Sequence, residues 1–156
     1  TAYAADISSW LQGKEGIETL RLLGNIIPDD FTTDGATERK RIEEITADKN
    51  KQAWIILFED EPVGVAEVDL NKTAEINAPH ISFFIGDKNN RGNGIGFAAL
   101  ILLVNELQIR GYRTIYGRTL TKNIASQKVM QKSGFITDGL VYADTDGLIW
   151  QNYKLK

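Results

Sequence analysis

The chain has no cysteine, one histidine, one methionine and three prolines among its 156 residues. The absence of cysteine excludes a disulfide framework, a thiolate nucleophile and a cysteine-based metal cluster. A single histidine also argues against a zinc site, because such sites draw several of their ligands from histidine and cysteine. We therefore expect no bound metal and no catalysis through a protein thiol.

Long apolar runs are also missing. The longest, Ile95 to Val104, is too short to span a bilayer. No basic and apolar leader precedes Tyr3, so we expect a cytoplasmic protein without membrane association. With 42% hydrophobic and 25% charged residues, the composition is typical of a globular protein, and the length predicts a single domain over residues 1–156.

Charge is unevenly placed along the chain. Residues 86–134 contain eight Lys or Arg and two carboxylates, a local charge of +6, so the rest of a chain of net charge −3 carries −9. A basic region suits a polyanionic cofactor, and an acidic region attracts a cationic acceptor. Surface charge clustered without a function explains the asymmetry equally well. The overall acidity argues against nucleic-acid binding, and the sequence leaves a homodimer open.

Apolar periodicity and turn residues predict alternating helices and strands. Helices are predicted over 6–24, with a break at 13–16, and over 36–48. Strands over 53–59 and 63–70 form a hairpin with its turn at 60–62. A strand at 80–85, a helix at 94–110, a strand at 113–120, a helix from Asn123 to Gly134 and a hairpin over 136–156 follow.

This order predicts an α/β fold, a mixed central sheet of about six or seven strands with flanking helices. The helix over 94–110 is apolar on nearly every side through Val104, so we expect it to be buried against the sheet.

The stretch from His80 to Phe97 combines a strand, a glycine-rich turn and a helix N-terminus. Glycine lets the backbone adopt positive φ and approach a ligand closely. The first amides of a helix lack intrahelical partners, and the helix dipole favours negative charge at that end. The stretch therefore predicts a site for a phosphate-bearing cofactor.

Two common nucleotide motifs do not fit the stretch. A P-loop requires Gly-Lys-Ser/Thr at the close of the turn, but Gly94 and Gly96 are followed by Ile95 and Phe97. A dinucleotide fingerprint beginning at Gly92 requires glycine where Phe97 stands. A nucleotide-dependent oxidoreductase is therefore disfavoured.

Arg91, Gly94 and Gly96 match the pattern Q/R-x-x-G-x-G/A, and the segment from Asn123 to Phe135 is an asparagine-capped helix ending in Gly-Phe. The two motifs together resemble the acetyl-CoA-binding region of the GNAT N-acetyltransferases. The loop Ile85-Gly-Asp-Lys88 and the helix start Asn123-Ile-Ala-Ser126 look most like the branch of ribosomal-protein N-terminal and spermidine acetyltransferases. The resemblance extends from about residue 62 to the C-terminus.

The resemblance implies acetyl-CoA as donor substrate, held where the strands 80–85 and 113–120 splay apart. Backbone groups of Phe83, Phe84 and Ile85 would bind the pantetheine arm. Asn123 would contact the same arm, cap its helix, or do both. The pyrophosphate would be bound by the turn and helix start, namely Arg91, Gly92, Asn93, Gly94, Ile95, Gly96 and Phe97. The two N-terminal helices would flank the acceptor pocket.

The implied reaction moves the acetyl group directly to a primary amine, such as a protein N-terminus, a polyamine or another small amine. Glu67 is the candidate base that deprotonates the amine, with Asp69, Asp144 and His80 as alternatives. Many family members place a tyrosine seven residues after the motif asparagine, where this chain has Met130, which cannot donate a proton. Either the thiolate leaves unaided or Ser126 takes the role of the acid. The rival hypothesis is a catalytically silent GNAT-fold module that binds CoA as a sensor.

Overall fold

The computed structural model describes residues 1–156 and contains five α-helices, one 3-10 helix and six strands. The N-terminal part holds three helices, α1 (Ala4–Trp10), α2 (Gly13–Leu22) and α3 (Gly35–Ala47). The central part runs through β1 (Lys51–Phe58), β2 (Glu61–Asp69), β3 (His80–Ile85), the 3-10 turn η1 (Lys88–Asn90) and α4 (Ile95–Ile109). The C-terminal part consists of β4 (Ile115–Leu120), α5 (Ile124–Lys132), β5 (Ile136–Ala143) and β6 (Ile149–Leu155).

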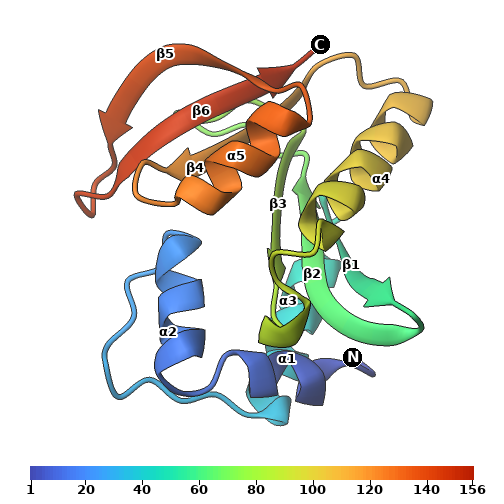
Figure 1. Ribbon diagram of the computed structural model, residues 1–156, viewed down its shortest axis with the longest axis vertical. Helices are drawn as coiled ribbons and strands as arrows, with labels where there is room; N and C mark the ends of the chain where they lie inside the picture. Colours follow the sequence, from blue (N-terminus) through green and yellow to red (C-terminus); the bar gives the residue numbers. More distant parts are fainter.

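The six strands form one sheet in the order β1-β2-β3-β4-β6-β5 (Figure 1). Every neighbouring pair is antiparallel except β3 and β4, which are parallel. The strand–helix–strand connection through α4 makes that parallel pair, as parallel strands require a crossover. The predicted α/β fold with a mixed sheet is confirmed.

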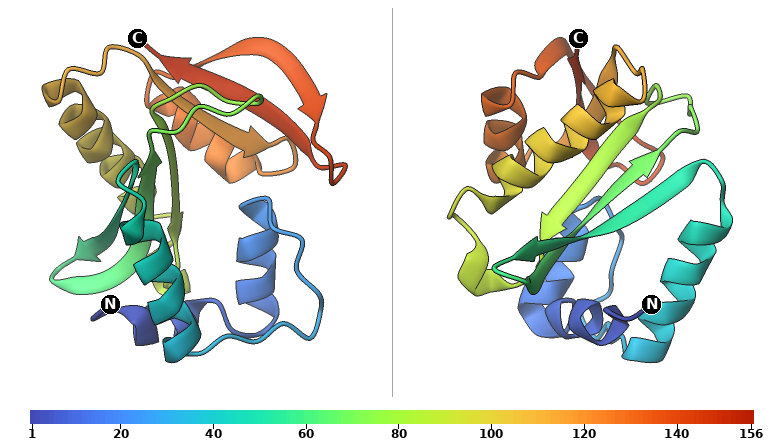
Figure 2. Two further views of the ribbon diagram at one scale, coloured as in Figure 1. Left: turned by 180° about the vertical axis from the view of Figure 1, so that it is seen from behind. Right: turned by 90° about the vertical axis from the view of Figure 1, so that its right-hand side faces the viewer.

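Helices cover both faces of the sheet (Figure 2). On one face α4 and α5 enclose the larger core, in which Leu100, Leu107 and Met130 pack against Ile81 and Ile115. On the other face a smaller core forms around Ile7, Leu11 and Val65, with side chains of α2 and α3 packed beside it. Because β2 is covered on both faces, its residues from Val63 to Ala66 are all buried.

The N-terminal half differs from the predicted boundaries in two places. The predicted break in the region 6–24 is present, but it lies before Gly13, which has a φ of +65° and begins α2, rather than at 13–16. The first hairpin turns at Glu59 and Asp60, both with positive φ, rather than at 60–62. A two-residue turn of this kind matches the twist of the strands it joins, so Phe58 pairs directly with Glu61.

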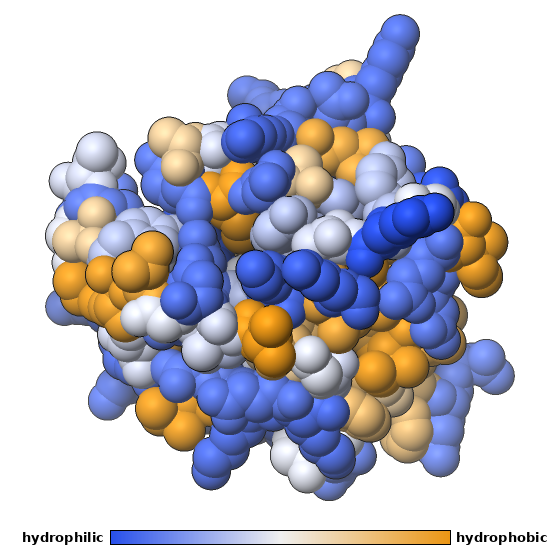
Figure 3. All heavy atoms as spheres, turned by 90° about the horizontal axis from the view of Figure 1, so that it is seen from above, coloured by the Kyte–Doolittle hydropathy of each residue, from blue (hydrophilic) through white to orange (hydrophobic).

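The helix α4 packs against the sheet as expected, but only one side of it is buried. Its residues Leu100, Leu103 and Leu107 are buried, but Leu102 is 70% and Ile109 is 82% exposed. A helix lying on one face of a sheet has only one side to bury, whatever its composition. On the face seen in Figure 3, apolar side chains lie in separate patches among hydrophilic ones. None of the helices has the length and apolar composition needed to cross a membrane.

Candidate active site

The strands β3 and β4 pair over only two positions, His80 with Tyr116 and Ile81 with Gly117. Both strands continue beyond this point, β3 to Ile85 and β4 to Leu120, so a gap opens between them (Figure 1). The rest of β3 remains paired on its other side with β2. The gap therefore borders a strand edge whose backbone groups have no partner strand.

The phase of the β2–β3 pairing shows which residues offer backbone groups to this gap. The Gly86 amide donates to the Val63 carbonyl at 2.8 Å, and backbone groups alternate in direction along a strand. Phe84 therefore directs its amide and carbonyl at β2, whereas Phe83 and Ile85 direct theirs toward the gap. Of the three residues predicted to bind the pantetheine arm, Phe83 and Ile85 have backbone groups oriented toward a ligand in the gap. Phe84 instead lines the neighbouring cavities.

The turn after β3 ends in an exposed helix N-terminus. Gly92 and Gly94 have φ of +76° and +80°, a conformation that strongly favours glycine. The first i to i−4 hydrogen bond runs from the Ala98 amide to the Gly94 carbonyl, and no side chain caps Gly94. The amides of the first three residues of α4 (Ile95, Gly96 and Phe97) are therefore open to an anion.

A groove of about 510 Å³ follows this turn. The turn and the start of α4 line one side, and residues of α2 and α5 line the other. The α5 side carries Lys128 and Lys132, and the Lys132 ammonium lies 4.5 Å from the centre of the Phe97 ring. Open amides on one side and lysines on the other give the groove the positive potential that a polyanion needs.

Arg91 is engaged by the protein itself. Its Nε donates to the Ile85 carbonyl at 2.9 Å, and its guanidinium also donates to the Gly86 carbonyl at 3.2 Å and the Thr19 hydroxyl at 3.1 Å. The side chain thus ties the turn to the end of β3 and to α2. Arg91 lines the groove, but its side chain shapes the turn.

The start of α5 forms the opposite wall. The Asn123 Oδ1 accepts from the Ser126 amide at 3.2 Å, so the predicted cap is present. Its Nδ2 donates to the Leu22 carbonyl at 3.4 Å, a contact with the end of α2. Asn123 and Ser126 line the groove and also a smaller cavity of about 220 Å³ in the gap between β3 and β4.

Met130, which stands where the resemblance leads one to expect a proton-donating tyrosine, belongs to the core. It is 4% exposed, and its terminal methyl lies against Gly117, where a Cβ would be only 2.5 Å away. The absence of a side chain on β4 at this point is what gives Met130 its place.

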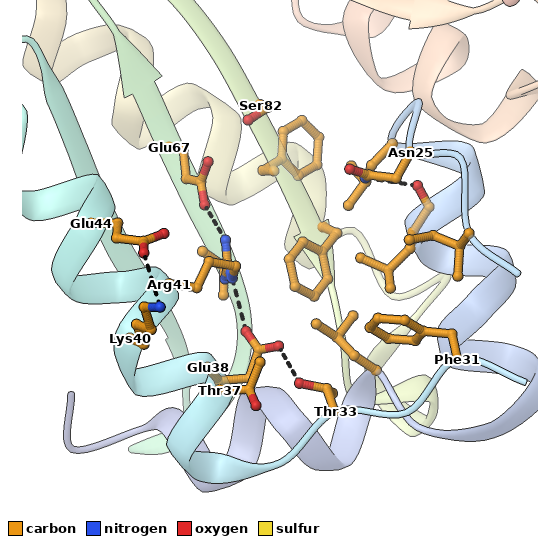
Figure 4. Close-up of a pocket in the computed structure, with 17 residues that line it drawn as sticks. Asn25, Phe31, Thr33, Thr37, Glu38, Lys40, Arg41, Glu44, Glu67 and Ser82 are labelled. Carbon is orange, nitrogen blue, oxygen red and sulfur yellow. Dashed lines mark hydrogen bonds and ion pairs between the residues drawn. The ribbon is translucent and has the colours of Figure 1, made fainter. Parts of the chain in front are cut away.

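A third cavity, of about 540 Å³, lies between α2, α3 and the strands β2 and β3 (Figure 4). Leucine and phenylalanine side chains form much of one wall, and charged residues of α3 form another. A chain of polar contacts crosses the charged wall: the Thr33 hydroxyl donates to Glu38 at 2.8 Å, Arg41 donates to Glu38 at 2.8 Å, and Arg41 reaches Glu67 at 3.4 Å. Glu67, the predicted base, therefore faces the cavity next to a guanidinium.

Glu38 and Arg41 were missed by the sequence analysis. Glu38 is only 3% exposed, and a buried carboxylate needs partners such as these. Burial would lower the pKa of Arg41, but the hydrogen bond and charge of Glu38, reinforced by Glu67, raise it above its usual value. The spacing of Glu38 and Arg41, three residues apart on a helix, indicated a pair, but not its burial.

The other candidate bases have separate surroundings. His80 lies 3.9 Å from Asp69, its Nδ1 is buried without a hydrogen-bond partner, and burial lowers its pKa. Asp144 accepts hydrogen bonds from the Trp150 indole at 2.8 Å and from two backbone amides, and these hydrogen bonds lower its pKa. Asp144 therefore stabilises the last hairpin turn as a carboxylate.

The three cavities share part of their walls. Leu23, at the end of α2, and Phe83, in β3, line all three. The groove beside the glycine turn, the cavity in the gap and the cavity beside Glu67 therefore meet at these two side chains. An anionic ligand in the groove can reach into the gap and face a second ligand beside Glu67.

Comparison with known proteins identifies the family. The model of the acetyltransferase (GNAT) domain matches residues 3–136. The chain belongs to the GNAT acetyltransferase family. Membership confirms the expected acetyltransferase and acetyl-CoA as its acetyl donor. Among curated proteins, none matches the chain in sequence.

Solved structures with the same fold include several acetyltransferases. The microcin C7 self-immunity acetyltransferase MccE, in complex with acetyl-CoA and AMP, has a TM-score of 0.79 at 17% identity and covers 99% of this chain and 87% of its own. The ribosomal L7/L12 α-N-protein acetyltransferase RimL gives 0.78 at 18% identity, with 99% and 84% covered. The aminoglycoside acetyltransferase AAC(6')-Ib, with ribostamycin and coenzyme A, gives 0.74 at 18%, with 97% and 87% covered. These identities establish a common fold, and the branch within the family stays a prediction.

Proposed function

We propose that this GNAT domain transfers the acetyl group of acetyl-CoA directly to a primary amine bound in the cavity beside Glu67. One observation carries the proposal: the groove at the glycine turn and the cavity beside Glu67 meet at Leu23 and Phe83, where β3 and β4 part. This junction is where a donor held in the groove would face an acceptor. We also propose that residues 1–156 act as a single domain, since helices from both ends of the chain line this junction.

The groove fits the donor. The open amides at the start of α4 and the lysines of α5 suit a diphosphate. The amide and carbonyl of Phe83 and the amide of Ile85 offer a strand edge to the amide-containing pantetheine arm, whereas the Ile85 carbonyl is already bonded to Arg91. Gly92, Asn93 and Gly94 supply the turn itself, and Asn123 closes the groove from α5. Coenzyme A supplies the activated thioester; the remaining tasks fall to side chains and backbone amides of the protein.

Three groups have the right placement for catalysis. Glu67 accepts the amine proton, directly or through water. The Phe83 amide, which faces the gap, donates to the thioester oxygen as negative charge develops there. The Ser126 hydroxyl, at the wall shared by the groove and the gap, donates to the departing sulfur. The amine nitrogen attacks the acyl carbon, the C–N bond forms, and the C–S bond breaks with its electrons going to sulfur.

The acceptor cavity favours an amine that also carries apolar groups. Its volume falls within the usual range for small-molecule sites. Three glutamates, Lys40 and Arg41 give its charged wall a net charge of −1, and leucine and phenylalanine side chains face that wall. A protein N-terminus with its first side chain, a polyamine or an aminoglycoside amine meets this description in part. RimL and AAC(6')-Ib, which share the fold, are named for acceptors of the first and third kinds.

A CoA-binding module without turnover is the second candidate. The specific observation in its favour is that Met130 packs in the core and Glu67 is paired with Arg41. The candidate proton donor is then Ser126, and the candidate base is a carboxylate that already has a partner. The same experiment separates the two candidates.

The test combines titration calorimetry of the full chain against acetyl-CoA with an assay of free CoA thiol. The amines are spermidine, kanamycin and a short peptide with a free N-terminus. Saturable thiol release with any of them supports the transferase. Saturable acetyl-CoA binding without release for every amine favours the module, and absence of acetyl-CoA binding refutes both.

A further inference from the structure

Thr119 is a buried hydroxyl residue without a partner. It lies in β4 and is 5% exposed, and its Oγ1 makes no hydrogen bond. Leaving a buried hydroxyl unsatisfied costs stability, so native structures nearly always provide a partner. Thr119 lines the 220 Å³ cavity in the gap between β3 and β4. Whatever satisfies it during function lies in that cavity.

The Ser126 hydroxyl lines the same cavity and also has no hydrogen-bond partner within the chain, because only its amide is bonded, to Asn123. Ser126 and Met130 are four residues apart and share a face of α5, and Gly117 and Thr119 share a face of β4. The helix returns antiparallel along the strand. Four helical residues rise about 6 Å and two strand residues about 6.6 Å. Since Met130 lies on Gly117, this spacing brings Ser126 to about the level of Thr119, and both residues line the same cavity.

In the structure the Thr119 and Ser126 hydroxyls are not hydrogen-bonded to each other. We propose that, when coenzyme A fills the cavity, Thr119 acts as a positioning residue: its hydroxyl donates a hydrogen bond to the Ser126 oxygen and so aims the Ser126 hydroxyl at the coenzyme A sulfur, because such hydrogen bonds often tighten only in the substrate complex. The inference rests on the proposed function of Ser126. Both hydroxyls keep their protons: Ser126 only donates a hydrogen bond to the thiolate that forms when the C–S bond breaks. A donor oriented and polarised by a second hydroxyl stabilises that charge better than one that rotates freely.

The decisive variants are Thr119→Val, which replaces the hydroxyl by a methyl, and Thr119→Ser, which keeps it. Thr121→Val is the matched control, because Thr121 follows the same strand but lines none of the three cavities. The first readout needs no acceptor: the pKa of the thiol of enzyme-bound coenzyme A, followed by the ultraviolet absorbance of the thiolate. The others are kcat with the amine that supports release, KM for acetyl-CoA, and thermal unfolding.

We expect Thr119→Val to raise the pKa of the bound thiol and to lower kcat roughly 3- to 10-fold, as expected for one hydrogen bond. KM for acetyl-CoA should stay within about twofold, since no group that binds the cofactor changes. Thr119→Ser and Thr121→Val should resemble the parent. Thr119→Val should unfold at the parent temperature or above, because the valine leaves no hydroxyl unsatisfied. The double variant Thr119→Val, Ser126→Ala should have the same kcat as Ser126→Ala alone.

An unchanged thiol pKa in Thr119→Val would overturn the inference. It would also be overturned if the fold-decreases in kcat of the two single variants multiplied in the double variant. These outcomes are distinct from failure of the proposed function. If the parent protein binds no coenzyme A, the proposed function itself is refuted. If the parent binds acetyl-CoA and turns it over, but Thr119→Val has the same thiol pKa and kcat as the parent, only the proposed role of Thr119 is refuted.

Discussion

Gly94 offers the sharpest test of the phosphate site. Gly94 has a φ of +80°, at which any residue other than glycine costs about 1–2 kcal/mol of folding free energy. The Gly94→Glu variant therefore carries this backbone strain. No atom lies within 4 Å of an added Cβ, so the side chain itself causes no clash. A carboxylate about 5 Å from a phosphate charge costs roughly 1–3 kcal/mol per pair. Two diphosphate charges then weaken acetyl-CoA binding by at least about 30-fold.

Two control variants separate these effects. Gly94→Gln has the same backbone strain and nearly the same size but no charge. Gly147→Glu adds the charge and the strain in the last hairpin turn, where φ is +77° and the space is equally open. Titration calorimetry should rank the affinities as parent, then Gly147→Glu close to it, then Gly94→Gln, then Gly94→Glu. The difference in acetyl-CoA affinity between Gly94→Gln and Gly94→Glu should decrease as salt is added. Equal affinity of Gly94→Glu and Gly94→Gln would refute the diphosphate assignment.

Three further predictions concern single side chains. Ser126→Ala should lower kcat more than acetyl-CoA affinity, and unchanged turnover would leave Ser126 with a structural role only. Glu38→Gln should lower the free energy of unfolding by about 1–3 kcal/mol in urea denaturation, because the buried contacts with Thr33 and Arg41 lose their charge; a variant as stable as the parent would contradict this. Burial lowers the pKa of His80 from 6.5, so the unfolded chain binds the proton more tightly and stability falls as pH drops from about 6.5 through the folded-state pKa. His80→Gln should remove that slope, and identical pH profiles of unfolding would contradict the burial argument.

The elements around the glycine turn could be predicted from sequence because their signals are local. The strand 80–85 coincides with β3, and Asn123 caps α5 as expected. Positive φ at Gly92 and Gly94 follows from residue type in a tight turn. The first hairpin was predicted, but its turn lies at Glu59 and Asp60 rather than at 60–62. Glu59 gives no local signal for positive φ, and the twist of the paired strands imposes it.

Arg91 and Glu38 show what local pattern cannot give. The motif placed Arg91 correctly in the turn, but three acceptors, one of them 72 residues away in α2, determine where its guanidinium points. Glu38 looked like one of many charges on a polar helix. Only the packing of α3 over the sheet removes it from water and gives it Thr33 and Arg41.

The sequence by itself indicated the family, the order of helices and strands, and the location of the glycine turn before α4, because glycine, asparagine caps and apolar periodicity act on neighbouring residues. The tertiary structure decided where β3 and β4 stop pairing, after two residue pairs, and hence where three cavities meet. It also decided that Thr119 is buried without a hydrogen-bond partner, in a cavity that Ser126 also lines. Both outcomes depend on contacts between segments distant in the chain, and no local propensity encodes those distances.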